Sequence, residues 1–199
     1  MIPALDAGRW IGEVLSTIPA RVAHLVVVDD GSSDDTAAVV RASSDPRVEL
    51  LRHVENRGVG AAMLTGYARA LELGAEVVVK VDADGQMDPA QIPRLIAPLL
   101  ARSADYVKGN RFLQAFPPPR MPAARFLGNL GLTFLTKFAS GYWNVFDPTN
   151  GYTAIHAEAL RRLDPSRVAE DYLFEISLLL ELRRHAAVVL DVAIPARYG

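Results

Sequence analysis

The chain has 199 residues, of which 50% are hydrophobic and 22% are charged, and this composition excludes a disordered polar chain. The formal net charge of -2 gives no reason to expect a nucleic-acid partner, and the absence of cysteine excludes disulfides, thiolate metal sites and a thiol nucleophile. Because this length suffices for one substantial core, we expect one α/β domain over residues 1–199.

Short apolar strands alternate with amphipathic helices through the first half of the chain. In chain order we expect a strand end at residues 2–3, a helix at 10–18 closed by Pro19, strands at 24–28 and 47–51, a loop at 56–60 that opens a helix to residue 73, a strand at 76–81 and a helix begun by Pro89. Another helix is expected to be capped by Ser33, Asp34 or Asp35. This alternation predicts a mostly parallel, Rossmann-like sheet with helices on both faces, in which ligands bind beyond the carboxyl ends of the strands.

The second half is less regular. We expect strands at residues 106–107 and 187–194, a loop at the prolines 117–119, an apolar helix at 124–140, a turn at 147–152 followed by a short strand and helix, and a helix at 171–184. Residues 106–146 contain no Asp or Glu, so their basic residues predict a positive surface; these are Lys108, Arg111, Arg120, Arg125 and Lys137. A peripheral helix on an anionic membrane, apolar face down, would suit this stretch.

Two carboxylates, Asp82 and Asp84, follow the predicted strand at residues 76–81. Side chains two residues apart in a strand point the same way, so both carboxylates can reach one hard cation. Mg²⁺ or Mn²⁺ suits such oxygen ligands, with water and phosphate completing the coordination, and Gln86 adds a neutral oxygen nearby. Taken alone, the pair is equally well explained as a solvated acidic turn.

Asp30 follows the strand at residues 24–28, where its carboxylate can accept hydrogen bonds from a nucleobase imide or a ribose hydroxyl. Gly58 and Gly60 form only a weak dinucleotide fingerprint, because the third glycine is absent. They are better explained as letting a helix start approach a ligand or the sheet closely.

Arg111 follows the strand that begins at residue 106, and its guanidinium suits bidentate contact with phosphate as well as a solvated surface position. Three acids lie near the start of a later predicted helix; they are Glu170, Asp171 and Glu175. They also fit a purely structural role, as favourable charge at the positive end of a helix dipole.

Six motifs occur in the order typical of family 2 glycosyltransferases. They are Ile2-Pro3-Ala4, Val28-Asp29-Asp30-Gly31-Ser32, Asn56-Arg57-Gly58-Val59-Gly60, Asp82-Ala83-Asp84-Gly85-Gln86, Gly109-Asn110-Arg111 and the segment 147–152. Within that family the chain most resembles the branch of dolichyl-phosphate mannose synthase and bacterial polyprenyl-phosphate glycosyltransferases. The resemblance covers nearly the whole chain. It implies a GT-A fold and inverting, metal-dependent transfer from a UDP- or GDP-linked sugar.

The resemblance also implies roles for individual residues. Pro3 lines the nucleotide pocket, Asp30 contacts the base and Gly58 adjoins the nucleotide-sugar. The metal–diphosphate site consists of Asp82, Ala83, Asp84 and Gln86. Arg111 and Arg125 face phosphate groups.

The acceptor decides whether a base is needed. A polyprenyl phosphate, which we expect, already carries a nucleophilic oxyanion, so the larger requirement is stabilisation of the leaving diphosphate by the metal at Asp82 and Asp84, with Arg111. A glycan or small-molecule hydroxyl would instead need a carboxylate base, and Asp171 is the residue for it. A nucleotide-sugar binding domain without transferase activity is a further alternative. A nucleotidyltransferase is disfavoured, because residues 4–9 do not resemble its glycine-rich loop.

The chain departs from the family pattern after Ile-Pro-Ala, where an aromatic residue, an asparagine and an acid are usual. Leu5 lacks a ring for the base, Asp6 replaces the asparagine, and Ala7 lacks the acid. Family members also continue past the segment that matches Arg197-Tyr198-Gly199, many of them into membrane helices. We therefore expect a catalytic domain that lacks part of its first strand and a C-terminal continuation, and that acts at the cytoplasmic face of a membrane.

Overall fold

The structure, a computed structural model, describes the chain except residues 112, 114–122, 148–149 and 196–199. Its strands are β1 (Ile2–Ala4), β2 (Leu25–Asp29), β3 (Val48–Arg52), β4 (Val77–Lys80), β5 (Tyr106–Asn110), β6 (Thr153–His156) and β7 (Val189–Ala193). Its α-helices are α1 (Gly8–Thr17), α2 (Thr36–Arg41), α3 (Val59–Glu72), α4 (Ile92–Leu100), α5 (Ala123–Ser140), α6 (Ala157–Arg162) and α7 (Phe174–Arg184). Short 3₁₀ turns, η1 (Pro89–Gln91) and η2 (Pro165–Arg167), precede α4 and α7.

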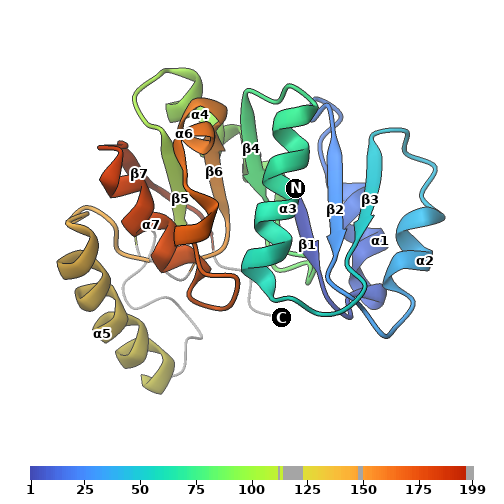
Figure 1. The fold of residues 1–199 in the computed structure, drawn as a ribbon, viewed down its shortest axis with the longest axis horizontal. Coiled ribbons are helices and arrows are strands. Elements are labelled where there is room, and N and C mark those ends of the chain that lie inside the picture. The colour runs from blue at the N-terminus through green and yellow to red at the C-terminus, as the bar shows by residue number, and fades with distance from the viewer. Residues whose placement is uncertain (112, 114–122, 148–149, 196–199) are drawn as a thin grey trace.

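The strands lie side by side in one layer (Figure 1). The first three are parallel in the order β1-β2-β3, and the others follow the order β4-β6-β5-β7 with β6 antiparallel to both neighbours. Met1 joins the two groups, because its carbonyl accepts from the Val81 N–H (3.1 Å) and its amino group donates to the Val79 carbonyl (2.9 Å). The predicted mostly parallel layer is confirmed, and the antiparallel β6 is a feature that the sequence pattern did not reveal.

Helices cover both faces of this layer because the buried strands are apolar on both sides. Val26 and Val28 of β2 pack into a core with residues of α3, α6 and α7. Leu25 and Val27, which alternate with them, pack into a second core with residues of α1, α2 and α4. A continuous apolar run is what a parallel strand buried on both faces requires. The polar residues that follow such strands therefore mark the edge of the sheet.

Helix α2 begins where the sequence predicts, and helix α7 begins later. The N-cap position of α2 belongs to Asp35, whose side chain makes no capping bond, whereas Asp34 Oδ1 accepts the N–H of Thr36 (2.9 Å). Helix α7 begins three residues later than expected, at Phe174, which leaves Asp171 in the preceding turn.

Helix α5 is polar on its inner side and apolar on its outer side. The buried residues of its last turns are polar; they are Thr133, Thr136, Lys137 and Ser140. The neighbouring aromatic and aliphatic side chains face outward, since Phe134, Leu135 and Phe138 are 58%, 70% and 83% exposed. This is the reverse of a helix that packs its apolar stripe against a core. Among the described residues, no helix combines the length and the hydropathy needed to cross a bilayer.

The predicted positive surface over residues 106–146 is wrong for the described basic side chains. Lys108 is fully buried, and Arg111 is ion-paired with Asp147. Lys137 points inward, where its Nζ donates to the Trp143 carbonyl (2.6 Å) and lies 3.2 Å from the Phe146 ring centroid. The number of basic residues in a segment therefore does not show how many are at the surface, because packing buries or pairs these side chains. Arg120 and the side chain of Arg125 lie outside the described residues.

Candidate active site

An open pocket of about 420 Å³ lies where β1, β2 and β4 end. Its lining comes from five segments of the chain; they are residues 3–7 with Trp10, Asp30, residues 56–62 in part, residues 82–84, and Asp171 with Tyr172. The pocket thus brings together most of the residues named from sequence, namely Pro3, Asp30, Gly58, Asp82, Ala83, Asp84 and Asp171. Its position agrees with the rule that ligands of parallel sheets bind beyond the carboxyl ends of the strands.

Asp82 and Asp84 reach the pocket from a turn rather than from a strand. Strand β4 ends at Lys80, so the expected strand alternation does not apply to the two acids. The Asp82 side chain is 34% exposed, and burial raises the pKa of its carboxyl. Asp84 is exposed and its Oδ1 accepts the backbone N–H of Gln86 (2.9 Å). The Gln86 side chain is also exposed, and it does not line the pocket.

The donor set fits a hard divalent cation that has other ligands. Asp82 and Asp84 offer carboxylate oxygens of the kind Mg²⁺ and Mn²⁺ prefer. In the part of the chain that the structure describes, no cluster of three or more acidic, histidine or cysteine side chains could hold a metal ion. Water and a bound diphosphate would therefore have to complete the coordination.

A buried ionic cluster lies directly behind Asp82. Lys80 Nζ is 3.3 Å from Asp82 Oδ1 and 3.1 Å from Glu175 Oε1. Lys108 Nζ is 3.0 Å from Glu175 Oε2, to which the Tyr106 hydroxyl also donates (3.1 Å). Burial alone would raise the pKa of Glu175, but the ammonium groups of Lys108 and Lys80 outweigh it and hold that pKa at about 2.

The local sequence pattern does not reveal this cluster. From sequence alone Glu175 fits a role as charge at a helix end, and Lys80 lies within the Val-rich strand β4. A lysine in such a strand is itself a signal, because a buried ammonium needs a carboxylate partner.

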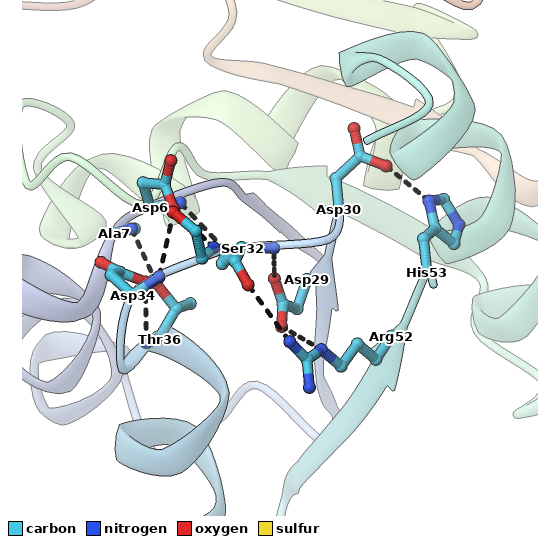
Figure 2. A network of polar contacts seen from close by, with 10 residues as sticks. Asp6, Ala7, Asp29, Asp30, Ser32, Asp34, Thr36, Arg52 and His53 are labelled. Carbon is cyan, nitrogen blue, oxygen red and sulfur yellow. Dashed lines mark hydrogen bonds and ion pairs between the residues drawn. The ribbon is translucent and has the colours of Figure 1, made fainter. Parts of the chain in front are cut away.

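Asp30 holds the loop before α3, as the right side of Figure 2 shows in part. Its Oδ1 lies 2.6 Å from His53 Nδ1 and accepts the N–H of Arg57 (3.0 Å), while its Oδ2 accepts the N–H of Gly58 (2.8 Å). The residue is buried at the wall of the pocket. A nucleobase that contacts Asp30 would therefore bind to a carboxylate that already accepts hydrogen bonds from within the protein.

The segment after β1 is fastened to the start of α2 (Figure 2). Asp6, whose backbone is left-handed (φ 48°), accepts the Ser33 N–H with its Oδ1 (2.8 Å). Ala7 donates its N–H to Thr36 Oγ1 (2.8 Å), and Gly8 donates to Asp34 Oδ2 (2.9 Å). Asp6 therefore has a structural use.

The pocket has an aromatic wall despite Leu5. Trp10, the first residue of the predicted helix at 10–18, lies in α1, is 40% exposed and lines the pocket. Leu5 lines it too, whereas Ala7 is buried. A ring is thus present five residues after the position where the family usually has one.

The glycines at the start of α3 allow close approach to another backbone segment, a partner that the sequence pattern did not indicate, and Gly58 also lines the pocket. A side chain at Gly58 or Gly60 would collide with the backbone at residues 169–170. The Glu170 carbonyl accepts the N–H of Gly60 (2.8 Å). This packing brings Asp171 to the pocket, where its Oδ1 accepts the N–H of Leu173 (2.8 Å).

Arg111 lies outside the pocket lining. Its Nε and Nη2 donate to the two carboxylate oxygens of Asp147 (2.7 and 2.9 Å), so its bidentate face is occupied. The structure therefore does not bring Arg111 to the other predicted residues, and Arg125 cannot be placed because its side chain lies outside the described residues.

Comparison with known proteins decides the family. Residues 1–164 match the family model described as glycosyl transferase family 2. The chain belongs to this family. As a family 2 glycosyltransferase it is an enzyme, which sets aside the binding-domain and nucleotidyltransferase alternatives.

Two relatives of this glycosyltransferase have names that state an acceptor. The UDP-N-acetylglucosamine–dolichyl-phosphate N-acetylglucosaminyltransferase of Methanococcus voltae is 30% identical over 213 residues, which cover 100% of this chain and 84% of the relative. The undecaprenyl-phosphate mannosyltransferase of Micrococcus luteus is 31% identical over 187 residues, which cover 92% and 75%. The resemblance to the polyprenyl-phosphate branch is confirmed.

A solved structure shares the fold. Glucosyl-3-phosphoglycerate synthase from Mycobacterium tuberculosis, crystallised with Mn²⁺, UDP and phosphoglyceric acid, matches with a TM-score of 0.76. The match covers 100% of this chain and 68% of that chain at 23% identity. The fold of this family 2 glycosyltransferase is therefore GT-A, as expected.

Proposed function

We propose that this enzyme transfers a sugar from a UDP- or GDP-linked donor to a polyprenyl phosphate, with inversion and with Mg²⁺ or Mn²⁺ at Asp82 and Asp84. The observation that carries the proposal is the pocket in which both carboxylates meet Pro3 and Asp30 at the strand ends. The names of the relatives supply the acceptor class.

The donor half of the proposal rests on the pocket wall. Pro3, Asp30 and Gly58 would face the nucleoside, and Trp10 would offer the ring that Leu5 does not. The crystallisation of the M. tuberculosis enzyme with Mn²⁺ and UDP supports a donor site that takes a metal and a nucleotide. Contact between Arg111 and phosphate stays a prediction, and it would require the pair with Asp147 to open.

The proposed chemistry needs no base on the protein. An acceptor phosphate oxygen would attack the anomeric carbon opposite the diphosphate, forming one C–O bond as the other breaks, and the electron pair would leave with the nucleoside diphosphate. A bound Mg²⁺ or Mn²⁺ would stabilise the charge on that leaving group. Asp82 and Asp84 would hold that ion and thereby orient the diphosphate.

The outward face of α5 supports a lipid acceptor. Its exposed apolar side chains, Phe134, Leu135 and Phe138, are followed by Trp143 and Phe146, which are also exposed. In Figure 1 α5 lies at the margin of the molecule, on the side toward which β1 runs. We propose that this face rests in a membrane surface, so that peripheral contact depends on apolar insertion rather than on basic charge.

Calorimetry with UDP- and GDP-sugars, with and without Mn²⁺, tests the donor site. We expect binding that needs Mn²⁺ and that weakens by about a hundredfold or more in Asp84→Asn, a loss typical of removing a charge-stabilising group. Asp88→Asn is the matched control, because Asp88 follows in the same loop, lies outside the pocket lining and keeps an N-cap side chain when changed to asparagine. Equal weakening in both variants would contradict the assignment.

A hydroxyl acceptor is the second candidate, favoured by the exposed Asp171 in the pocket. If the acceptor is a phosphate, Asp171→Asn should keep transfer within about threefold of wild type, since no proton must be removed. If it is a hydroxyl, the same change should lower kcat by about a hundredfold or more. The two acceptors are thus separated by one variant assayed with each.

A further inference from the structure

The two pocket carboxylates are not equivalent. Asp84 is exposed, and its carboxylate accepts the backbone N–H of Gln86. Asp82 faces the ammonium of Lys80, which is almost completely buried, at 3.3 Å. One of the two predicted metal ligands therefore already has a cation beside it.

The balance of buried charges behind Asp82 explains why Lys80 forms an ion pair with Asp82. Lys80 and Lys108 carry two positive charges, whereas Glu175 between them carries one negative charge. The remaining positive charge is matched by Asp82. Buried charges without a partner are strongly unfavourable, so this ammonium keeps a carboxylate unless another group replaces it.

Gly151 lies beside the pair formed by Lys80 and Asp82. A Cβ at this position would collide with Lys80 Nζ and would lie 2.9 Å from Asp82 Oδ2. The absence of a side chain at position 151 therefore leaves the space in which Lys80 and Asp82 lie close together.

We propose that Lys80 is a positioning residue that competes with a divalent cation for Asp82, so that the pocket holds a cation firmly only together with a diphosphate. The inference rests on the proposed function, because it concerns the same metal site. Asp84, together with an Asp82 whose charge is compensated by Lys80, provides too little negative charge and too few oxygen ligands for a divalent cation. A diphosphate would supply both. The absence of any third acidic ligand among the described residues fits this dependence.

The cluster offers matched variants with effects of opposite sign. Lys80→Gln keeps polar contact with Glu175 and removes the competing charge, so Mn²⁺ alone should bind about tenfold more tightly, the effect of a modest change in local charge. Glu175→Gln leaves Lys80 with Asp82 as its remaining carboxylate and should weaken Mn²⁺ binding. Lys108→Gln also breaks an ion pair with Glu175 but does not touch Asp82, so the change should stay below about threefold.

The experiment is titration of each variant with MnCl₂ alone, and then with UDP or GDP in excess Mn²⁺, beside thermal unfolding to confirm that each variant folds. Should Lys80→Gln fail to fold, Lys80→Met serves instead, with the same expectation. Mn²⁺ affinity that is unchanged or weaker without Lys80, or equally raised without Lys108, would overturn the inference. Failure of every nucleotide to bind wild type would instead refute the proposed function, and the response to MnCl₂ alone separates the two.

Discussion

The pocket and helix α5 place their polar residues in opposite ways. Around the pocket, acids that follow buried strands stand at the edge of the sheet, and internal hydrogen bonds hold them there. In α5, polar side chains turn inward and aromatic ones turn outward. An acidic residue directly after a buried strand was therefore a good predictor of a position at the pocket. The number of basic residues in the α5 region did not predict a basic surface, because the Lys137 ammonium is buried against the Trp143 carbonyl.

The largest expected effect separates the two regions by function. Replacing Phe134 and Phe138 together by serine should abolish most binding to lipid vesicles and leave the melting temperature unchanged, because both side chains are exposed. Asp84→Asn should show the reverse pattern, with vesicle binding intact and transfer lost. Co-sedimentation with neutral and anionic vesicles measures the first property.

A matched apolar control makes that comparison specific. Leu100→Ser removes an exposed leucine from the end of α4, far along the chain from α5, and should leave vesicle binding at the wild-type level. If it reduces binding as much as the α5 changes do, exposed apolar area in general is responsible, and the role assigned to α5 is wrong.

Trp10 tests the pocket side of the comparison. Stacking of a base on an aromatic ring contributes about 1–3 kcal/mol, so Trp10→Ala should weaken nucleotide binding by about tenfold or more. Trp10→Phe keeps a ring and should recover most of the affinity. Calorimetry with the preferred nucleotide measures both, and equal affinity in all three proteins would show that the base lies elsewhere.

Replacing Lys137 should have a smaller effect, and it tests whether this ammonium contributes to a basic membrane-binding surface. Lys137→Met should leave binding to anionic vesicles unchanged, since the ammonium points inward and burial lowers its pKa. The lost bond to the Trp143 carbonyl should reduce the free energy of unfolding by about 1 kcal/mol. Weaker binding of Lys137→Met to anionic vesicles, at unchanged stability, would show that Lys137 belongs to a basic membrane-binding surface after all.

The buried cluster behind Asp82 should give stability a pH dependence. The pKa of Glu175 is about 2 in the folded chain, below its ordinary value of 4.5, so its contribution to stability is full above about pH 4.5 and is lost as pH falls toward 2. Urea unfolding between about pH 5 and pH 3 should show this loss in wild type. Glu175→Gln should lack that part of the acid sensitivity, and an identical pH profile would contradict the assignment.

The sequence predicted the order of strands and helices and most of the pocket, because both depend on local patterns. Asp82 and Asp84 after an apolar run are visible without knowing any tertiary contact. The antiparallel β6 and the burial of Lys108 depend on pairings between distant segments, and no local pattern encodes them. The place of Trp10 in the pocket wall could not be predicted, because helical spacing does not say which apolar residue lies at the exposed edge of the helix.

The central claim is most directly tested by transfer itself. Purified protein would be incubated with a panel of UDP- and GDP-linked sugars and a polyprenyl phosphate, with MnCl₂ or with EDTA, and the anomeric form of any lipid-linked sugar would be determined. We predict transfer from at least one donor, with inverted configuration, in MnCl₂ and none in EDTA. Transfer that persists in EDTA, product of retained configuration, or no lipid-linked sugar from any donor would contradict the account.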